Sequence, residues 1–141
     1  MTLEQGFWLA HVPAVIGWIA LLTAPLFGRR AVPIARIAAV VLAVGYLVMF
    51  VAAPDGLRVL VTNYSLDGIA SLFADRRVLL LGWIHYLAFD LWVASWEVEE
   101  GKRLGMPHWQ VGVCAFLTIM LGPLGLLLFL AIRGGRASVA T

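Results

Sequence analysis

The stretch Trp83-Ile84-His85-Tyr86-Leu87-Ala88-Phe89-Asp90-Leu91-Trp92 is built mainly of residues that dissolve in lipid, yet it contains a histidine and a carboxylate. An aspartate at the centre of a membrane-spanning helix costs roughly 2.5–3.5 kcal/mol on insertion scales, so it usually faces a bundle interior or a cavity and has a partner. We therefore expect His85 and Asp90 to mark a functional site inside a membrane helix.

The composition of the whole chain supports a membrane protein. Of 141 residues, 62% are hydrophobic and 13% are charged, and mean hydropathy is +0.95. Soluble domains are usually about 45–50% apolar. Four stretches are long enough to cross about 30 Å of hydrocarbon: residues 7–27, 33–53, 78–97 and 109–132. The sequence predicts an all-α integral membrane bundle of four transmembrane helices, forming one domain over residues 1–141.

The connection between the second and third predicted spans, residues 54–77, is too polar to cross a membrane. Its apolar residues recur with a loosely helical spacing, while Arg58, Asp67 and Asp75 interrupt them. We expect an interfacial or re-entrant helix that caps the bundle. It could cover a lipid entrance as a lid, or lie passively at the interface.

The arginines and lysines do not assign an orientation to a four-span bundle. The positive-inside rule counts cationic residues near the helix ends. Five lie on one side (Arg29, Arg30, Arg36, Lys102, Arg103) and five on the other (Arg58, Arg76, Arg77, Arg133, Arg136). The net charge of +2 fits arginines at a lipid headgroup boundary, and no basic cluster interleaved with aromatics indicates nucleic acid. We expect an integral protein of a bacterial inner membrane or an equivalent membrane.

The third predicted span arranges its polar residues on two faces. Trp83, Asp90 and Glu97 are seven residues apart and share one face, with Tyr86 on its flank. His85 is about 140° around the axis from Asp90, so the two meet only through substrate, water or another helix. Glu97 is expected to reach headgroup water at the helix end.

An aromatic row on the His85 face is wide enough to grip a flat conjugated molecule; it consists of His85, Phe89, Trp92 and Trp96. The alternative for His85 is a hydrogen-bonded packing role, and for Asp90 a structural one. Tryptophans near span ends also form interfacial belts.

Two other predicted spans are interrupted. His11 and Pro13 lie in the first, and Gly122-Pro123-Leu124-Gly125 divides the fourth near its middle. Proline removes a backbone donor and frees a carbonyl to bind something else. The common outcome is a kink; the other is a midplane site where freed carbonyls face Asp90.

A metal site is not expected, although His11, His85, Asp90 and Glu97 are the residue types that zinc or ferrous iron prefer. The chain has no His-x3-His or Glu-x2-His pair, so these ligands would have to meet entirely through tertiary packing. Neither a Gly-x-Ser-x-Gly elbow nor a phosphate-cradling loop is present. We expect no cofactor.

Several short motifs together resemble one known family. Trp83-Ile84-His85, Asp90-Leu91, Glu100-Gly101 and Gly122-Pro123-Leu124-Gly125 are similar to the abscisic-acid-deficient-four-like, or neoxanthin synthase-type, family of integral membrane proteins. The likeness is strongest over residues 68–130. The family commonly has an arginine just after the Asp-Leu segment, where this chain has Ser95.

The resemblance implies that a violaxanthin epoxide opens to an allenic alcohol with no net oxidation. This reaction needs an acid at the epoxide oxygen and a base at the neighbouring carbon. His85 and Asp90 can supply both, with Asp90 as donor and His85 as acceptor, or the reverse. The expected substrate-binding residues are His11, Trp83, Tyr86, Phe89, Trp92, Trp96 and Pro123.

The function favoured by these observations is a membrane-embedded isomerase of a carotenoid or related isoprenoid, with the membrane and this polyprenoid lipid as its partners. One alternative is a non-catalytic carotenoid- or lipid-binding partner protein. Another is a small proton-coupled transporter that uses Asp90 as a relay. A homo-oligomer stays open, and a dimer would supply the second half that such transporters commonly contain.

Overall fold

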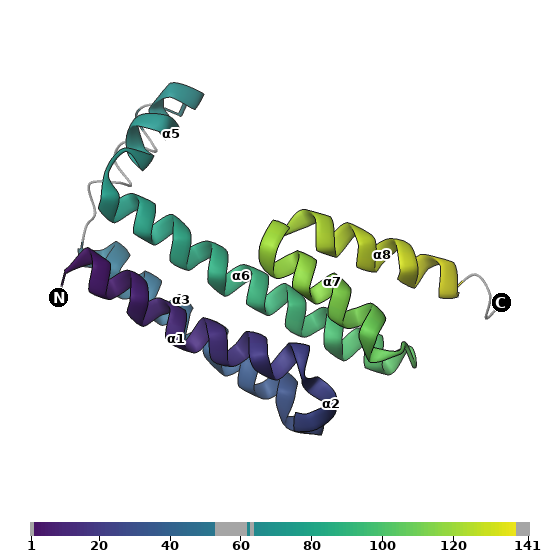
Figure 1. The fold of residues 1–141 in the computed structure, drawn as a ribbon. Helices are drawn as coiled ribbons and strands as arrows, with labels where there is room; N and C mark the ends of the chain where they lie inside the picture. Colours follow the sequence, from purple (N-terminus) through teal and green to yellow (C-terminus); the bar gives the residue numbers. More distant parts are fainter. Residues whose placement is uncertain (1, 53–61, 63, 138–141) are drawn as a thin grey trace.

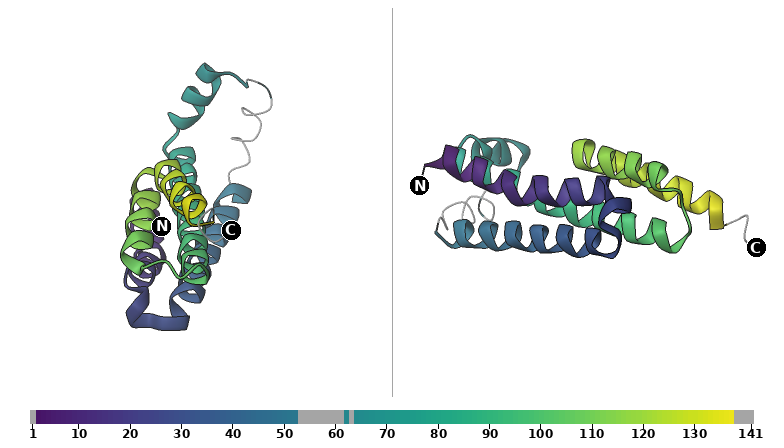
Figure 2. Two further views of the ribbon diagram at one scale, coloured as in Figure 1. Left: turned by 90° about the vertical axis from the view of Figure 1, so that its right-hand side faces the viewer. Right: turned by 60° about the horizontal axis from the view of Figure 1, so that its bottom comes forward.

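The structure is a computed structural model that describes residues 2–52, 62 and 64–137, and over these residues it contains helices and no strand. Three long helices lie side by side: α1 (Leu3–Leu22), α3 (Ala31–Ala52) and α6 (Arg76–Arg103), as Figures 1 and 2 show. The predicted all-α bundle is confirmed.

The chain reverses between α1 and α3 through the short helix α2 (Ala24–Phe27) and a 3-10 turn, η1 (Gly28–Arg30). Pro25 suits the first turn of α2, where a missing N–H costs nothing. Gly28 has a φ of 59°, a left-handed conformation that glycine adopts without the steric cost of a side chain. The result is a tight connection that keeps α1 and α3 antiparallel neighbours.

Small residues let the long helices approach closely. The buried positions of α1 and α3 are mainly alanine, and Gly17 of α1 faces α6 so tightly that an added Cβ would lie 2.7 Å from a Leu91 methyl carbon. Small interfacial residues are typical of membrane helix packing, where dispersion contacts replace the hydrophobic effect between helices. The large apolar side chains of α3 point outward instead, among them Ile37, Leu47, Val48 and Val51.

Among the described helices, three are long and apolar enough to cross a membrane: Leu3–Leu22, Ala24–Ala52 and Arg76–Arg103. Together with the outward apolar surface, they indicate a membrane protein. The expected count of four spans is not confirmed.

The stretch expected to form a fourth span is two helices. α7 (His108–Leu121) and α8 (Pro123–Ala137) lie side by side as an antiparallel hairpin. Gly122 turns the chain with a φ of 49°, and Gly125 lies so close to α7 that an added Cβ would overlap the backbone of Thr118. Pro123 therefore begins a new helix, where its missing N–H is tolerated, instead of kinking a continuous one.

The predicted connecting helix is present in part. α5 (Leu66–Phe73) begins at Ser65, whose hydroxyl accepts from the Gly68 N–H at 3.0 Å, and it stands away from the bundle (Figure 2). Phe73 holds it to α6, because its ring occupies the space that a Cβ on Gly82 would need. Residues 54–61 and 63 of the predicted connection lie outside the described residues.

Candidate functional site at the middle of helix α6

Asp90 lies near the midpoint of α6, about 20 Å from either end at roughly 1.5 Å per residue. The turn of the α7–α8 hairpin lies beside it: an added Cβ on Gly122 would be 3.5 Å from Asp90 Oδ1. Asp90 Oδ2 is buried and has no hydrogen-bond partner in the described part of the chain. A buried carboxyl oxygen without a partner is costly, which makes this position the strongest candidate for chemistry.

Tyr86 joins α6 to the end of α7. Its hydroxyl donates to the Ile119 carbonyl at 3.2 Å, and its side chain also lies beside the Asp90 carboxyl. Residue 123 would supply the helical donor for the Ile119 carbonyl, but proline has no N–H. Ile119 lies in the last turn of α7, where carbonyls have no helical donor, and Tyr86 occupies its carbonyl. A midplane site of freed carbonyls that face Asp90 stays a prediction. The Pro123 side chain itself is exposed.

Glu97 lies about 10 Å along the helix axis from Asp90 on the same face. It is fully buried; the Thr118 hydroxyl donates to Oε1 at 2.8 Å, while Oε2 is buried without a partner among the described residues. The expectation that Glu97 reaches headgroup water was wrong, because α7 covers this face of α6. α6 thus carries a half-buried carboxyl, Asp90, and a fully buried one, Glu97, on one stripe.

His11 and Trp83 extend the Asp90 side of the site toward α1. His11 Nδ1 is 2.8 Å from the Phe7 carbonyl, and Trp83 Nε1 is 3.4 Å from His11 Nε2. A carbonyl only accepts and an indole N–H only donates, so this geometry assigns the neutral imidazole with its proton on Nδ1. The Trp83 ring stacks on Tyr86 at 5.6 Å between centroids. His11, Trp83, Tyr86 and Asp90 therefore follow one another along one side of α6.

His85 lies on a different side of α6, as its angular separation from Asp90 predicts. Its ring stacks on Phe89 at 4.5 Å and lies 5.9 Å from Tyr46 of α3. His85 and Phe89 are both exposed on the outer surface. Sequence reasoning did not single out Tyr46, because a lone tyrosine in an apolar helix carries no signal until its neighbour on another helix is known.

The aromatic row predicted next to His85 does not form one continuous surface. Within the row, Phe89 alone stacks on His85. Trp96 instead packs edge-on against Phe129 of α8 at 5.2 Å, and the Arg36 guanidinium of α3 lies 5.4 Å over the exposed ring of Trp92. Arg36 Nε also lies 3.4 Å from the Ser95 hydroxyl. Arg36 of α3 thus brings a guanidinium to the segment of α6 where the resembled family commonly has an arginine.

Glu100 fixes the hairpin to the end of α6, and sequence reasoning missed this role. Arg103 Nε donates to Oε2 at 2.7 Å, and Arg133 Nε of α8 donates to Oε1 at 3.0 Å. Gly101, the next residue, faces Val111 of α7 so closely that an added Cβ would lie 2.5 Å from its methyl group. Ion pairs and close packing together fix α7 and α8 against α6.

The four residues considered as metal ligands do not converge. Nowhere in residues 2–52, 62 and 64–137 do three His, Cys, Asp or Glu side chains come together in a group that could hold a metal ion. His11 instead contacts the Trp83 ring and His85 the Phe89 ring, on different sides of α6.

A comparison with known families agrees with the motif resemblance. A family model described as ABA DEFICIENT 4-like matches residues 5–129, which run from the first turns of α1 to Phe129 in α8. No curated protein and no solved structure matches the chain. Because the matched region covers most of the chain, including Asp90 and the hairpin turn, the chain belongs to the ABA DEFICIENT 4-like family.

Proposed function

We propose that this protein is a membrane-embedded isomerase of a carotenoid or related isoprenoid. The observation that supports this most is Asp90, a carboxyl at the middle of α6 with one buried oxygen unpartnered, next to the hairpin turn. Membership in the ABA DEFICIENT 4-like family supports a carotenoid-related role. Aromatic side chains beside the carboxyl suit a flat conjugated substrate.

The proposed reaction breaks a C–O bond of an epoxide and forms a C=C bond. One proton is added to the epoxide oxygen and one is removed from the neighbouring carbon, so the mass of the substrate does not change. Asp90 exchanges one of these protons. Two histidines could exchange the other: His85, which the sequence favours, and His11, which is linked to the Asp90 side through Trp83 and Tyr86.

We also propose that α7 and α8 enter the membrane from one side and return to it. α7 has 14 residues and is about 21 Å long, too short for about 30 Å of hydrocarbon. Its non-helical residue, Gly122, is buried against α6, and irregular backbone at membrane depth is tolerated only where protein covers it. The protein would then have three spans and a re-entrant hairpin, in a bacterial inner membrane or its equivalent.

Pigments from carotenoid-producing cells test the reaction. Cells that express the protein should contain a new isomer of unchanged mass by chromatography and mass spectrometry. Asp90→Asn should abolish the isomer while the purified protein retains pigment. Asp67→Asn, which makes the same chemical change on exposed α5, should have no effect. Comparing His85→Gln with His11→Gln then identifies the second group.

Two outcomes contradict the isomerase. If folded protein retains pigment without converting it, the non-catalytic binding protein replaces the enzyme. If folded protein neither retains nor converts pigment, the carotenoid proposal fails for the substrates supplied. If Asp90→Asn still converts pigment, Asp90 is not a catalytic residue.

One observation favours the transporter as a second candidate. Asp90 is half-buried and Glu97 fully buried on the same stripe of α6, and each has a buried oxygen without a partner in the described structure. Chains of carboxyl groups inside membranes form proton relays in pumps and transporters. Proteoliposomes with a trapped pH dye test this: a pH gradient should collapse faster with the protein, and Glu97→Gln should abolish the effect. No acceleration excludes the relay.

A further inference from the structure

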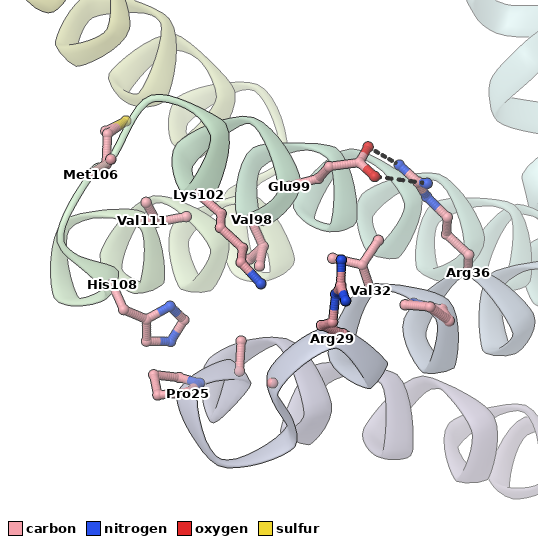
Figure 3. A pocket seen from close by; sticks show the side chains of 14 residues that line it. Pro25, Arg29, Val32, Arg36, Val98, Glu99, Lys102, Met106, His108 and Val111 are labelled. Atoms are coloured by element: carbon pink, nitrogen blue, oxygen red, sulfur yellow. Dashed lines mark hydrogen bonds and ion pairs between the residues drawn. The ribbon is translucent and has the colours of Figure 1, made fainter.

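A pocket lies at the end of the bundle opposite α5, far along α6 from Asp90. It has a volume of about 660 Å³ and is formed where α2, η1 and the start of α3 face the end of α6 and the start of α7 (Figure 3). None of the residues assigned to the Asp90 site lines it. Any occupant of this pocket is therefore distinct from a ligand at the Asp90 site.

Positive charge dominates the polar lining. Arg36 is neutralised by Glu99, with 2.6 Å between Nη2 and Oε2. Arg29 and Lys102 have no ion pair or hydrogen bond with any described residue, and Figure 3 shows both side chains pointing into the same space. Two unpaired cations from different elements, facing one cavity, favour an anion that can accept from both.

The remaining lining is apolar and runs along the helices, with Pro25, Val32, Val98 and Val111 on its walls. His108 does not add a free donor through Nε2, because that nitrogen is 2.9 Å from the Leu22 carbonyl and donates to it. A small hydrated anion would leave these apolar walls uncovered. An anion with a hydrocarbon chain satisfies both parts of the lining.

The hairpin changes the charge balance between the two ends of the bundle. Arg133 pairs with Glu100 and Arg136 donates to Gln110, so both lie at the same end as the pocket. This end now carries seven cationic residues: Arg29, Arg30, Arg36, Lys102, Arg103, Arg133 and Arg136. By sequence position, three belong to the other end: Arg58, Arg76 and Arg77. The positive-inside rule then assigns the pocket to the cytoplasmic side.

We propose that this pocket binds the phosphate of an anionic lipid from the cytoplasmic leaflet. Arg29 and Lys102 contact the phosphate oxygens, and the lipid chain follows the apolar walls toward the membrane. Anionic lipids concentrate at the cytoplasmic surface, where they attract basic residues next to membrane helices. The proposal does not depend on the isomerase, because the two sites share no residue.

Lipid binding to the purified protein in neutral detergent tests the site. The probes are phosphatidylglycerol, phosphatidylcholine and inorganic phosphate, titrated against tryptophan fluorescence. We expect phosphatidylglycerol to bind at least about tenfold more tightly than phosphatidylcholine, and Arg29→Gln with Lys102→Gln to remove that preference. The matched control, Arg30→Gln with Arg136→Gln, removes the same charge at the same end but outside the pocket. This control should keep the preference for phosphatidylglycerol.

Three results would overturn the proposal. An equal loss in the control pair would mean that overall charge attracts the lipid. Inorganic phosphate that binds as tightly as phosphatidylglycerol would mean that the site takes free phosphate. No preference in the unaltered protein would mean that no anionic lipid site exists. If the double variant does not fold, the single variants Arg29→Gln and Lys102→Gln decide, each with an expected loss of about threefold or more.

Discussion

The hydroxyl of Tyr86 donates a hydrogen bond of 3.2 Å to the carbonyl of Ile119, which lies in the last turn of α7 and has no donor within that helix. This contact links the middle of α6 to the end of α7 and keeps the hairpin turn next to Asp90. Two residues 33 positions apart in sequence thus join the two helices, because the end of α7 leaves a carbonyl without a helical donor and Tyr86 supplies one.

Tyr86→Phe should destabilise the protein by about 1 kcal/mol, because a buried carbonyl loses its donor while the packing of the ring is kept. Thermal unfolding in detergent measures the change. Tyr46→Phe is the control, since Tyr46 contacts His85 and Phe50 through its ring and has no hydrogen bond to a described residue. Equal effects of the two variants would show that the Ile119 contact contributes nothing.

Gly122→Ala should lower pigment conversion by an amount that its loss of stability does not explain. Alanine at a φ of 49° costs about 1–2 kcal/mol, and its methyl group would also lie 3.5 Å from Asp90 Oδ1. Gly105→Ala is the control that carries the backbone effect alone, because Gly105 has a φ of 62° and open space around it. Both variants should lose stability in thermal unfolding, Gly122→Ala the more because Gly122 also has a ψ of −100°, while product formed per folded protein falls only in Gly122→Ala. If Gly122→Ala and Gly105→Ala formed equal amounts of product, the hairpin turn would not be part of the catalytic site.

Gly125→Ala should open the hairpin, because a Cβ there would overlap the backbone of Thr118. A clash with backbone cannot be relieved by a side-chain rotation, so we expect a loss of about 2 kcal/mol or more, as for overpacked cores. Gly134→Ala, later in the same helix and in open space, should instead raise stability by up to about 1 kcal/mol. Unfolding midpoints in detergent compare the two. A tolerated Gly125→Ala would contradict the close packing of α7 and α8.

The sequence was informative where local rules decide the outcome. Helical periodicity separated His85 from Asp90 correctly, and the cost of a carboxylate in lipid pointed to Asp90 itself. The sequence was uninformative where contacts between residues distant in the chain decide the structure. A proline in the middle of a mostly apolar stretch of 24 residues, 109–132, fits a kink or a reversal equally well. The choice depends on Gly125 against Thr118 and on Arg133 with Glu100. Glu97 was misjudged for the same reason, since α7, a later segment, buries it.

The position of the C-terminus distinguishes a hairpin from a fourth span. Four spans would put both ends of the chain on one side of the membrane, whereas three spans and a re-entrant hairpin put them on opposite sides. Arg136 reaches Gln110 at the start of α7, so α8 ends beside the segment where α7 begins. With seven cationic residues at this end against three assigned to the other end by sequence position, we expect the C-terminus in the cytoplasm and the N-terminus outside.

Reporter fusions in bacterial cells measure both ends. Green fluorescent protein at the C-terminus should fluoresce, because it folds in the cytoplasm, and alkaline phosphatase at the same position should be inactive. A short epitope tag before Thr2 should be accessible to antibody in spheroplasts without permeabilisation. Adding Arg136→Gln to the C-terminal fusion controls for charge: the Arg133–Glu100 pair and the packing at Gly125 are kept, so the fusion should stay fluorescent. Both ends on one side would restore the four-span bundle, and would move the hairpin turn away from Asp90.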